Sequence, residues 1–196
     1  MSNNTKQYIE NEATQIRQDY DLIDYEIDLF KLGEDLGIDI QTQSQKSHGI
    51  SGALIRNGND FLIYYASSIN NIPYQRFSIA HEFGHYFLPE HPENIFNKDG
   101  THFSTAGSSS KDPYEREADY FAACLLMPEE SFQRDLWKRK KFSFDVIDYL
   151  SKEYNVSKTS CALRFAEVGN HPIKIVYAEN GMVKWQKNSQ GFPYWN

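Results

Sequence analysis

Two histidines and a glutamate near the middle of the chain have the residue types and the spacing needed for metal-dependent hydrolysis. They form the run His81-Glu82-Phe83-Gly84-His85, an H-E-x-x-H motif. On an α-helix, residues four apart lie on one face about one turn from each other, so both imidazoles can reach a single ion. Neutral imidazole suits zinc well. Glu82 lies about 100° around the helix from His81, which leaves its carboxylate beside the ion, where a general base for an attacking water belongs.

The motif is short, and three matching residues also arise by chance in on the order of one in a few hundred chains of this length. Here the flanking residues favour the metal interpretation. Ile79, Phe83 and Phe87 form a helical stripe that would press into a core. Gly84 costs a helix interior about 0.8–1 kcal/mol relative to alanine. Its presence therefore predicts that another backbone or a ligand passes close to this position.

The third metal ligand must come from another element, because a catalytic zinc site takes three protein ligands and keeps one position open. Glu115 and Asp119 lie four apart on one face of a helix expected at residues 112–127. Carboxylates that point into a core need a cation or donors. We predict that Glu115 is the third ligand and that Asp119 accepts the other ring N–H of a ligand histidine, His81. A competing interpretation makes Glu115 a capping-box residue of its own helix, and the two roles are compatible.

One alternative third ligand is His91, six residues after His85, which matches the longer motif H-E-x-x-H-x-x-G-x-x-H. The glycine of that motif is replaced by Leu88, so we favour Glu115. Glu117 is weaker still, since it lies about 200° around its helix from Glu115. A donor is also needed to stabilise the oxyanion. The candidates are Tyr86, His91, His102 and Tyr114, and the sequence does not choose among them.

The hydrophobic periodicity predicts the elements that position these residues. Helices are expected at residues 5–20 and 28–36, and strands at residues 50–55 and 61–65 around Asn57-Gly58, a strong hairpin signal. This gives a small, mostly antiparallel sheet that leads into the motif helix, residues 73–88. The segment 90–112 is expected to be one long loop beside the metal. We expect an extended substrate to add to the edge of strand 61–65.

The C-terminal part is predicted to be helical, with helices at residues 129–139, 143–154 and 157–167 and a hairpin of strands 173–177 and 182–186 around Asn180-Gly181. Residues 143–167 have the outline of a helix-turn-helix. A plain helical hairpin is favoured, because the second helix offers few base-reading side chains. These are Lys158, Thr159, Ser160 and Arg164.

Composition limits the range of partners. With 196 residues, 40% of them hydrophobic, the chain is long enough for a well-buried core, and its formal net charge of −7 argues against a sequence-independent grip on nucleic acid. The N-terminus is polar, and no stretch approaches the roughly 20 apolar residues of a membrane span. We therefore expect a cytoplasmic protein with no membrane partner. Its two cysteines, Cys124 and Cys161, are expected to be reduced and buried.

Two runs of sequence extend the candidate site. The first is Arg76-Phe77-Ser78-Ile79-Ala80-His81-Glu82-Phe83-Gly84-His85. The second is Glu115-Arg116-Glu117-Ala118-Asp119-Tyr120-Phe121-Ala122-Ala123-Cys124-Leu125-Leu126-Met127-Pro128. Together they resemble the ImmA/IrrE family of metallo-endopeptidases, and the second run makes the resemblance specific. The resemblance is clear over residues 28–128.

The resemblance implies an α+β, zincin-like peptidase. Residues 1–130 would form the metallopeptidase domain, and residues 131–196 a helical extension with a terminal hairpin, packed on it as one structural unit. It also implies Zn²⁺ held by His81, His85 and Glu115, with Glu82 as the catalytic residue. The implied substrate is a helix-turn-helix repressor, whose cleavage releases genes of a mobile element, a prophage or a stress response.

Two other functions stay open. The first is a non-enzymatic regulator that binds a repressor or DNA through residues 143–167 and keeps zinc only for structure. The second is a zinc-dependent hydrolase of small amides.

Overall fold

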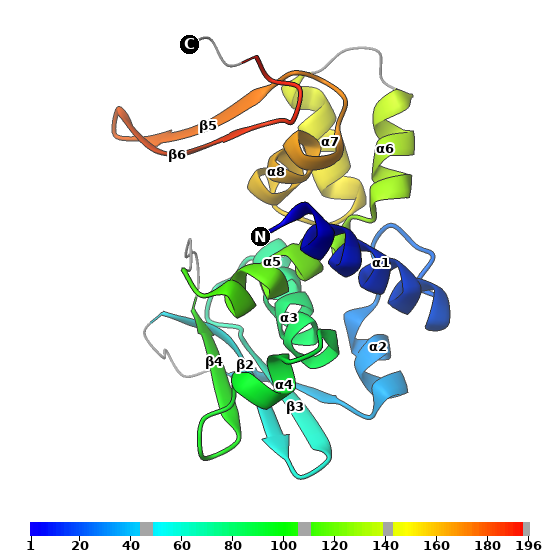
Figure 1. Cartoon of the computed structure of the whole chain (residues 1–196), viewed down its shortest axis with the longest axis vertical. Coiled ribbons are helices and arrows are strands. Elements are labelled where there is room, and N and C mark those ends of the chain that lie inside the picture. Colours follow the sequence, from blue (N-terminus) through cyan, green and yellow to red (C-terminus); the bar gives the residue numbers. More distant parts are fainter. Residues whose placement is uncertain (44–48, 106–110, 139–142, 194–196) are drawn as a thin grey trace. The chain divides into compact units, whose positions relative to one another are not determined.

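The computed structural model describes residues 1–43, 49–105, 111–138 and 143–193. They form two compact units, Met1–Leu126 and Met127–Asn196. The first unit combines helices with a small sheet, and the second combines three helices with a β-hairpin (Figure 1). The predicted α+β class is confirmed.

The first unit opens with two helices that the sequence predicts well. Helix α1 (Asn3–Asp19) begins at Ser2, whose hydroxyl accepts the amide of Thr5, and buries a stripe made of Ile9, Ala13 and Ile16. Helix α2 (Leu29–Leu36) begins at Asp28, whose carboxylate accepts two amides of the first turn, and ends at Gly37 with φ 70°. A left-handed residue that ends a helix is the common role of glycine.

Four strands form the sheet in the order β1-β3-β2-β4. Their bounds are Asp39–Gln43 for β1, Ile50–Asn57 for β2, Asp60–Ala66 for β3 and Thr101–Thr105 for β4. Strand β1 is parallel to β3, and the other two pairings are antiparallel, so the mostly antiparallel sheet is confirmed. The cross-strand partners Leu54 and Ile63 are fully buried. They help to form the core between the sheet and the helices.

The segment 90–112 corrects two of our expectations. It is not one long loop, because it contains the short helix α4 (His91–Asn94) and the strand β4. The tight turn before β4 is made by Gly100 at φ 72°, whose carbonyl accepts the amide of Arg56 at 2.7 Å and begins the pairing with β2. The expected substrate position is also wrong. Strand β3 is paired on both sides, whereas β4 lies at the edge of the sheet.

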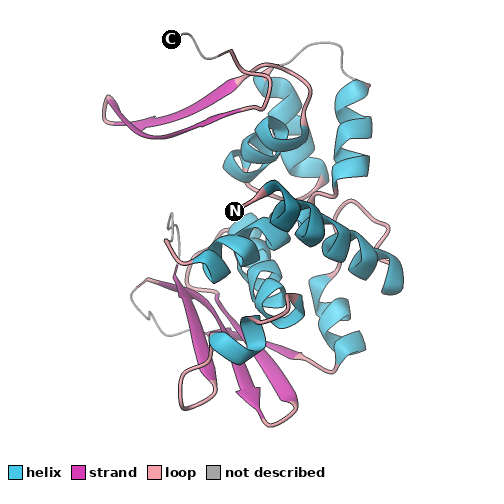
Figure 2. Ribbon diagram, viewed as in Figure 1, coloured by secondary structure: helices cyan, strands magenta, loops and turns pink. Residues whose placement is uncertain are grey.

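Helices α3 (Ile72–Phe87) and α5 (Pro113–Leu126) carry the chemistry and pack directly on each other (Figure 2). Each starts at a side-chain cap, Asn71 for α3 and Asp112 for α5. They meet at Gly84, where a Cβ would lie 3.0 Å from the Cα of Ala118. The prediction that another backbone passes close to Gly84 is confirmed. This close approach brings the first turns of α5 beside the histidines of α3.

The second unit contains the predicted helices and the predicted hairpin. These are α6 (Glu129–Trp137), α7 (Phe144–Glu153), α8 (Lys158–Val168), β5 (Lys174–Glu179) and β6 (Met182–Asn188). In the hairpin turn, Asn180 and Gly181 both have positive φ, 51° and 75°. Two successive left-handed residues make the type of turn for which Asn-Gly is preferred. The core of this unit is formed by Phe132, Leu150, Tyr154 and Phe165.

Two further expectations concern the cysteines and the membrane. Neither Cys124 nor Cys161 is in a disulfide within the described ranges, and both are buried, as predicted. Within the described ranges, no helix has the length and apolar character that crossing a bilayer requires.

Candidate metal centre

Three side chains from two helices bring their ligand atoms together. His81 and His85 come from α3, and Glu115 comes from the first turn of α5. The two Nε2 atoms lie 3.1 Å apart, His85 Nε2 lies 3.3 Å from Glu115 Oε1, and His81 Nε2 lies 3.5 Å from Glu115 Oε2. With bonds of about 2.0–2.1 Å in a tetrahedron, ligand atoms of one zinc ion are about 3.3 Å apart. The donor set therefore fits a zinc ion in both chemistry and spacing.

His81 is oriented by Asp119, as predicted. Its Nδ1 lies 2.9 Å from Asp119 Oδ1. A carboxylate only accepts, so Nδ1 carries a hydrogen, and Nε2 is the ring nitrogen that faces the other ligand atoms. Burial lowers the pKa of His81, but its hydrogen bonds with Asp119 and Glu115 outweigh burial and raise the pKa to about 10. The position therefore attracts positive charge strongly.

His85 is fully buried and is backed by a second histidine. Its Nδ1 lies 3.0 Å from Nδ1 of His91, and Nε2 of His91 lies 3.5 Å from Glu117 Oε2. Burial lowers the pKa of His85 to about 3, with the neighbouring His81 and His102 acting in the same direction. The imidazole is thus neutral, the form that binds metal. His91 thus contacts the Nδ1 side of the His85 ring and does not belong to the three-residue cluster.

Glu115 is surrounded by three histidines. Besides its contacts with His81 and His85, its Oε1 accepts a hydrogen bond from Nε2 of His102 at 2.8 Å. Burial raises the pKa of Glu115, but the hydrogen bonds from the three imidazoles outweigh burial and hold the pKa far below its usual range. Glu115 is therefore a charged carboxylate, as a ligand should be. The sequence pattern predicts a loop where β4 lies, so it does not indicate the contact between His102 and Glu115.

Glu82 lies beneath the sheet at Gly52 of β2. It is fully buried, and a Cβ on Gly52 would come 2.5 Å from its Oε1. Neither carboxylate oxygen has a hydrogen-bond partner among the residues that the structure describes. Burial raises the pKa of Glu82 to about 7, against the lowering effect of His81. The sequence contained no signal for the role of Gly52, because the contact joins two distant segments.

The four oxyanion candidates differ in their surroundings. The ring of Tyr86 packs edge-on against Phe61, and the ring of Tyr114 packs edge-on against His91. His91 in turn faces His85. The ring nitrogen of His102 contacts Glu115, so His102 lies directly beside the candidate ligands.

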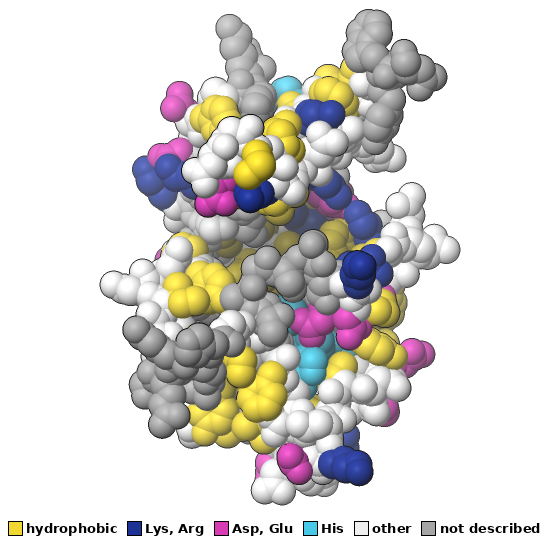
Figure 3. All heavy atoms as spheres, turned by 90° about the vertical axis from the view of Figure 1, so that its left-hand side faces the viewer, with side chains coloured by type: hydrophobic (Ala, Val, Ile, Leu, Met, Phe, Trp, Pro, Cys, Tyr) yellow, Lys and Arg dark blue, Asp and Glu magenta, His cyan; other side chains and the backbone are white. Residues whose placement is uncertain are grey.

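The site reaches the protein surface. The side chain of Asp119 is 43% exposed and that of Glu117 is 29% exposed, whereas His85 is fully buried. Figure 3 shows histidine and acidic side chains side by side at the surface, with hydrophobic side chains next to them. The acidic side chains around the cluster are therefore partly open to solvent, whereas the side chain of Glu115 is 14% exposed.

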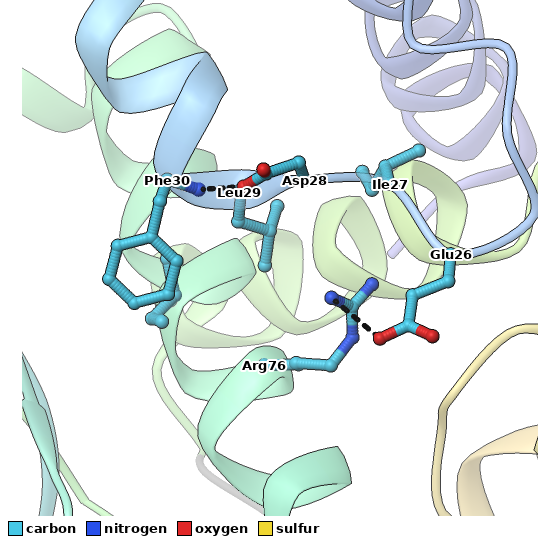
Figure 4. A pocket seen from close by; sticks show the side chains of 7 residues that line it. Glu26, Ile27, Asp28, Leu29, Phe30 and Arg76 are labelled. Carbon is cyan, nitrogen blue, oxygen red and sulfur yellow. Dashed lines mark hydrogen bonds and ion pairs between the residues drawn. The ribbon is translucent and has the colours of Figure 1, made fainter.

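A separate pocket of about 290 Å³ lies at the start of α2 (Figure 4). The Nη1 of Arg76 lies 3.7 Å from Glu26 Oε1 there, while Nε and Nη2 are buried and have no hydrogen-bond partner within the described ranges. None of the three candidate ligands lines this pocket. The lining residues are Glu26, Ile27, Asp28, Leu29, Phe30, Arg76 and Ile79.

Comparison with known proteins gives the fold and the family of the chain. A solved structure described as a Mycobacterium tuberculosis transcriptional regulator is similar in fold, with a TM-score of 0.62 at 14% sequence identity. The similarity covers 95% of this chain and 56% of that one, so the present chain spans little more than half of that protein. No curated protein matches the chain. The model of the peptidase family Peptidase_M78, described as the IrrE N-terminal-like domain, matches residues 33–166, and the chain belongs to this family.

Proposed function

We propose that this protein is a zinc-dependent endopeptidase whose substrate is a helix-turn-helix repressor. The observation that carries the proposal is the convergence of two imidazole nitrogens and one carboxylate, 3.1–3.5 Å apart, inside a peptidase-family domain. Two imidazole nitrogens and a carboxylate oxygen this close together form a ligand set for a cation, and a bound cation would compensate the burial of the carboxylate charge.

In this proposal, His81, His85 and Glu115 hold the ion. When bound, zinc supplies a Lewis acid that lowers the pKa of a water molecule and polarises a carbonyl group. Glu82 accepts a proton from the attacking water on a carboxylate oxygen and passes it to the nitrogen of the leaving amine. Its pKa of about 7 suits a group that must gain and lose a proton near neutral pH.

Strand β4 is the element best placed to bind an extended substrate. It lies at the sheet edge and carries His102, whose ring contacts Glu115. An added segment would form main-chain hydrogen bonds with this edge, as in other cases of strand addition. The scissile bond would then lie beside the metal cluster.

The number of ligands favours an enzyme over a regulator with structural zinc. Structural zinc sites are usually closed by four protein ligands, whereas the cluster found among the described residues has three. Two of the candidate base-reading side chains on α8 also bind other groups of the second unit. Arg164 is 2% exposed and donates to the carbonyl of Met127, and Lys158 pairs with Asp148. These contacts favour a packing role for this helical pair over base reading.

The repressor substrate rests on the family resemblance, and a link to transcription is consistent with the name of the structural neighbour, a transcriptional regulator. Cleavage of such a repressor would release the genes that it controls, such as those of a mobile element, a prophage or a stress response.

The test uses a purified helix-turn-helix repressor encoded beside this chain, incubated with the zinc-loaded protein and with Glu82→Gln. We expect cleavage at one or a few sites, detected by mass spectrometry, for the unaltered protein. Glu82→Gln should bind zinc with unchanged affinity and cleave at least about 100-fold more slowly.

Three results would contradict the proposal. Equal cleavage by Glu82→Gln would remove Glu82 as the base. Repressor binding without cleavage would favour the non-enzymatic regulator. Hydrolysis of small amides together with indifference to the folded repressor would favour the small-amide hydrolase.

A further inference from the structure

We infer that His91 and Glu117 are positioning residues for the candidate metal ligand His85, and that they do so by fixing the hydrogen of His85 on Nδ1. The inference rests on the proposed metal site. It assigns a role to two residues that lie outside the three-residue cluster. They connect the buried face of His85 to the partly exposed side chain of Glu117.

The carboxylate of Glu117 sets the direction of the hydrogen bonds that link it through His91 to His85. Glu117 only accepts, so Nε2 of His91, 3.5 Å away, carries its hydrogen. A neutral His91 then has a bare Nδ1, which must accept from the Nδ1–H of His85 across 3.0 Å. That arrangement leaves Nε2 of His85 bare, facing Nε2 of His81 at 3.1 Å. The reverse order would place a hydrogen on the very atom that must bind the ion.

His91 is held in place by a turn that runs against backbone preference. Glu90, the residue before it, has φ 69°, a left-handed conformation that costs a non-glycine residue on the order of 1 kcal/mol. The turn is closed by the amide of His91, which donates to the carbonyl of Leu88 at 3.3 Å, and by Asn94, whose side chain donates to the carbonyl of Glu90 at 2.6 Å. This turn directs His91 back toward α3. It replaces the glycine turn of the longer motif that the sequence lacks.

The inference also explains why three acidic residues alternate at the start of α5. Glu115 contributes to the cluster, Asp119 orients His81, and Glu117 orients His85 through His91. Glu117 lies on another side of the helix from Glu115, so it cannot reach the ion itself. His91 spans the gap between Glu117 and His85. Each candidate ligand histidine thus has its second nitrogen engaged, which is the usual arrangement in protein metal sites.

The experiment measures zinc affinity by competition with a chromophoric chelator for the full chain and four variants. His91→Leu removes the acceptor, whereas His91→Asn keeps one, because the amide oxygen of asparagine can take the place of Nδ1. Glu117→Ala and Glu117→Gln form the second matched pair at a side chain that is 29% exposed. Circular dichroism of each chelated variant checks folding, and the Glu117 pair keeps the test decisive if His91→Leu does not fold.

We expect zinc affinity to fall about 10–100-fold in His91→Leu, less in Glu117→Ala, and to stay within about threefold of the unaltered protein in His91→Asn and Glu117→Gln. Long-range ¹H–¹⁵N NMR of the zinc-loaded chain should show His85 with hydrogen on Nδ1. The visible spectrum of the cobalt-loaded protein should change in His91→Leu but not in His91→Asn.

The outcomes separate this inference from the proposed function. Unchanged affinity in both His91→Leu and Glu117→Ala, or an Nε2–H tautomer of His85, would overturn the positioning role while leaving the metal site intact. Equal weakening by the leucine and asparagine variants would also overturn it, because lost packing would then explain the effect. No zinc binding by the unaltered chain would overturn the proposed function itself.

Discussion

Glu82 is a fully buried carboxylate, and burial raises its pKa more than the neighbouring His81 and the Ser104 hydroxyl lower it. Such a group is expensive to ionise, and its pKa of about 7 lies above the ordinary value of 4.5. A carboxyl with a raised folded-state pKa binds its proton more tightly when folded. Its contribution to stability is therefore fully present below about pH 4.5 and is lost as the pH rises through 7.

The first prediction follows from this loss of stability with rising pH. In chelator, Glu82→Gln should gain stability relative to the unaltered protein as the pH rises from 4.5 to 8, because the variant has no charge to bury. The gain should be on the order of 3 kcal/mol, at about 1.4 kcal/mol per unit of pKa. Urea unfolding at several pH values measures it, with Glu34→Gln, an exposed carboxyl on α2, as control. A difference that does not change with pH would show that Glu82 is not desolvated.

Gly52 shapes the site although it carries no functional group. A methyl group at this position would lie 2.5 Å from Glu82 Oε1, and the flexible carboxylate would move before the strand does. We therefore predict that Gly52→Ala slows peptide cleavage at least about tenfold, since small displacements of a catalytic group are costly. Zinc affinity should stay within threefold, because the three atoms nearest to the added methyl belong to Glu82 and Tyr64, and neither is a candidate ligand. Cleavage at the unaltered rate would mean that the position of Glu82 is not critical.

At the scale of elements, the separation of α3 and α5 determines the geometry of the cluster. Gly84 lets the two helices approach, and a Cβ there would lie 3.0 Å from the Cα of Ala118 and 3.2 Å from both its carbonyl oxygen and a ring carbon of Phe121. These neighbours are mostly backbone, so relief requires a movement of α5. Such a movement carries Glu115 away from the histidines of α3.

We predict that Gly84→Ala weakens zinc binding about tenfold, because metal geometry tolerates displacements of only about 0.5 Å. The free energy of unfolding in chelator should fall by about 0–2 kcal/mol. Overpacking costs about 1–3 kcal/mol, while helix propensity returns about 1 kcal/mol. Chelator competition and urea unfolding measure the two quantities. Gly191→Ala, where a Cβ meets no atom within 4 Å, is the control. Unchanged zinc affinity would show that the metal site tolerates a change in the distance between α3 and α5.

The elements that the sequence predicts well are those whose signals are local. Asp28 and Gly37 bound α2, Asn71 begins α3, and Asn180-Gly181 turns the last hairpin, as caps and turn residues indicate. Strand β4 was not predicted, because it is short and lies between turn-forming residues. It is defined by its pairing with β2. The substrate edge was misplaced for the same reason. Strand order depends on contacts between distant segments, which periodicity does not encode.

In the candidate site, too, the residues with local sequence signals were predicted and the contacts between distant segments were not. The candidate ligands His81, His85 and Glu115 and the orienting Asp119 were found from helical spacing, because four-residue intervals place side chains on one face. Three other contacts were not predicted. His102 on strand β4 contacts Glu115, His91 after a strained turn contacts His85, and Gly52 in the sheet lies against Glu82. Each depends on a tertiary approach that no local pattern records.

At the scale of the whole molecule, the two units differ in what they contain. All three candidate ligands lie in Met1–Leu126, whereas Trp137 and Trp185 lie in Met127–Asn196, and the third tryptophan, Trp195, is outside the described residues. The fluorescence of Trp137 and Trp185 therefore reports on the second unit, and zinc acts on the first. Far-UV circular dichroism reports on both.

This division allows a test of whether the units unfold separately. A ligand that binds only the folded state stabilises it by about 2.7 kcal/mol at 100 times its dissociation constant. For a unit of this size, that gain raises the unfolding temperature by roughly 10 °C. We predict that zinc at this concentration raises, by this amount, the part of the circular dichroism transition that comes from the first unit, and leaves the fluorescence transition in place. Glu115→Gln, which removes the charged ligand, should abolish the zinc-induced shift. A fluorescence transition that moves together with the dichroism signal would show instead that the two units unfold as one, so that metal bound near α3 stabilises the hairpin and helices of the second unit as well.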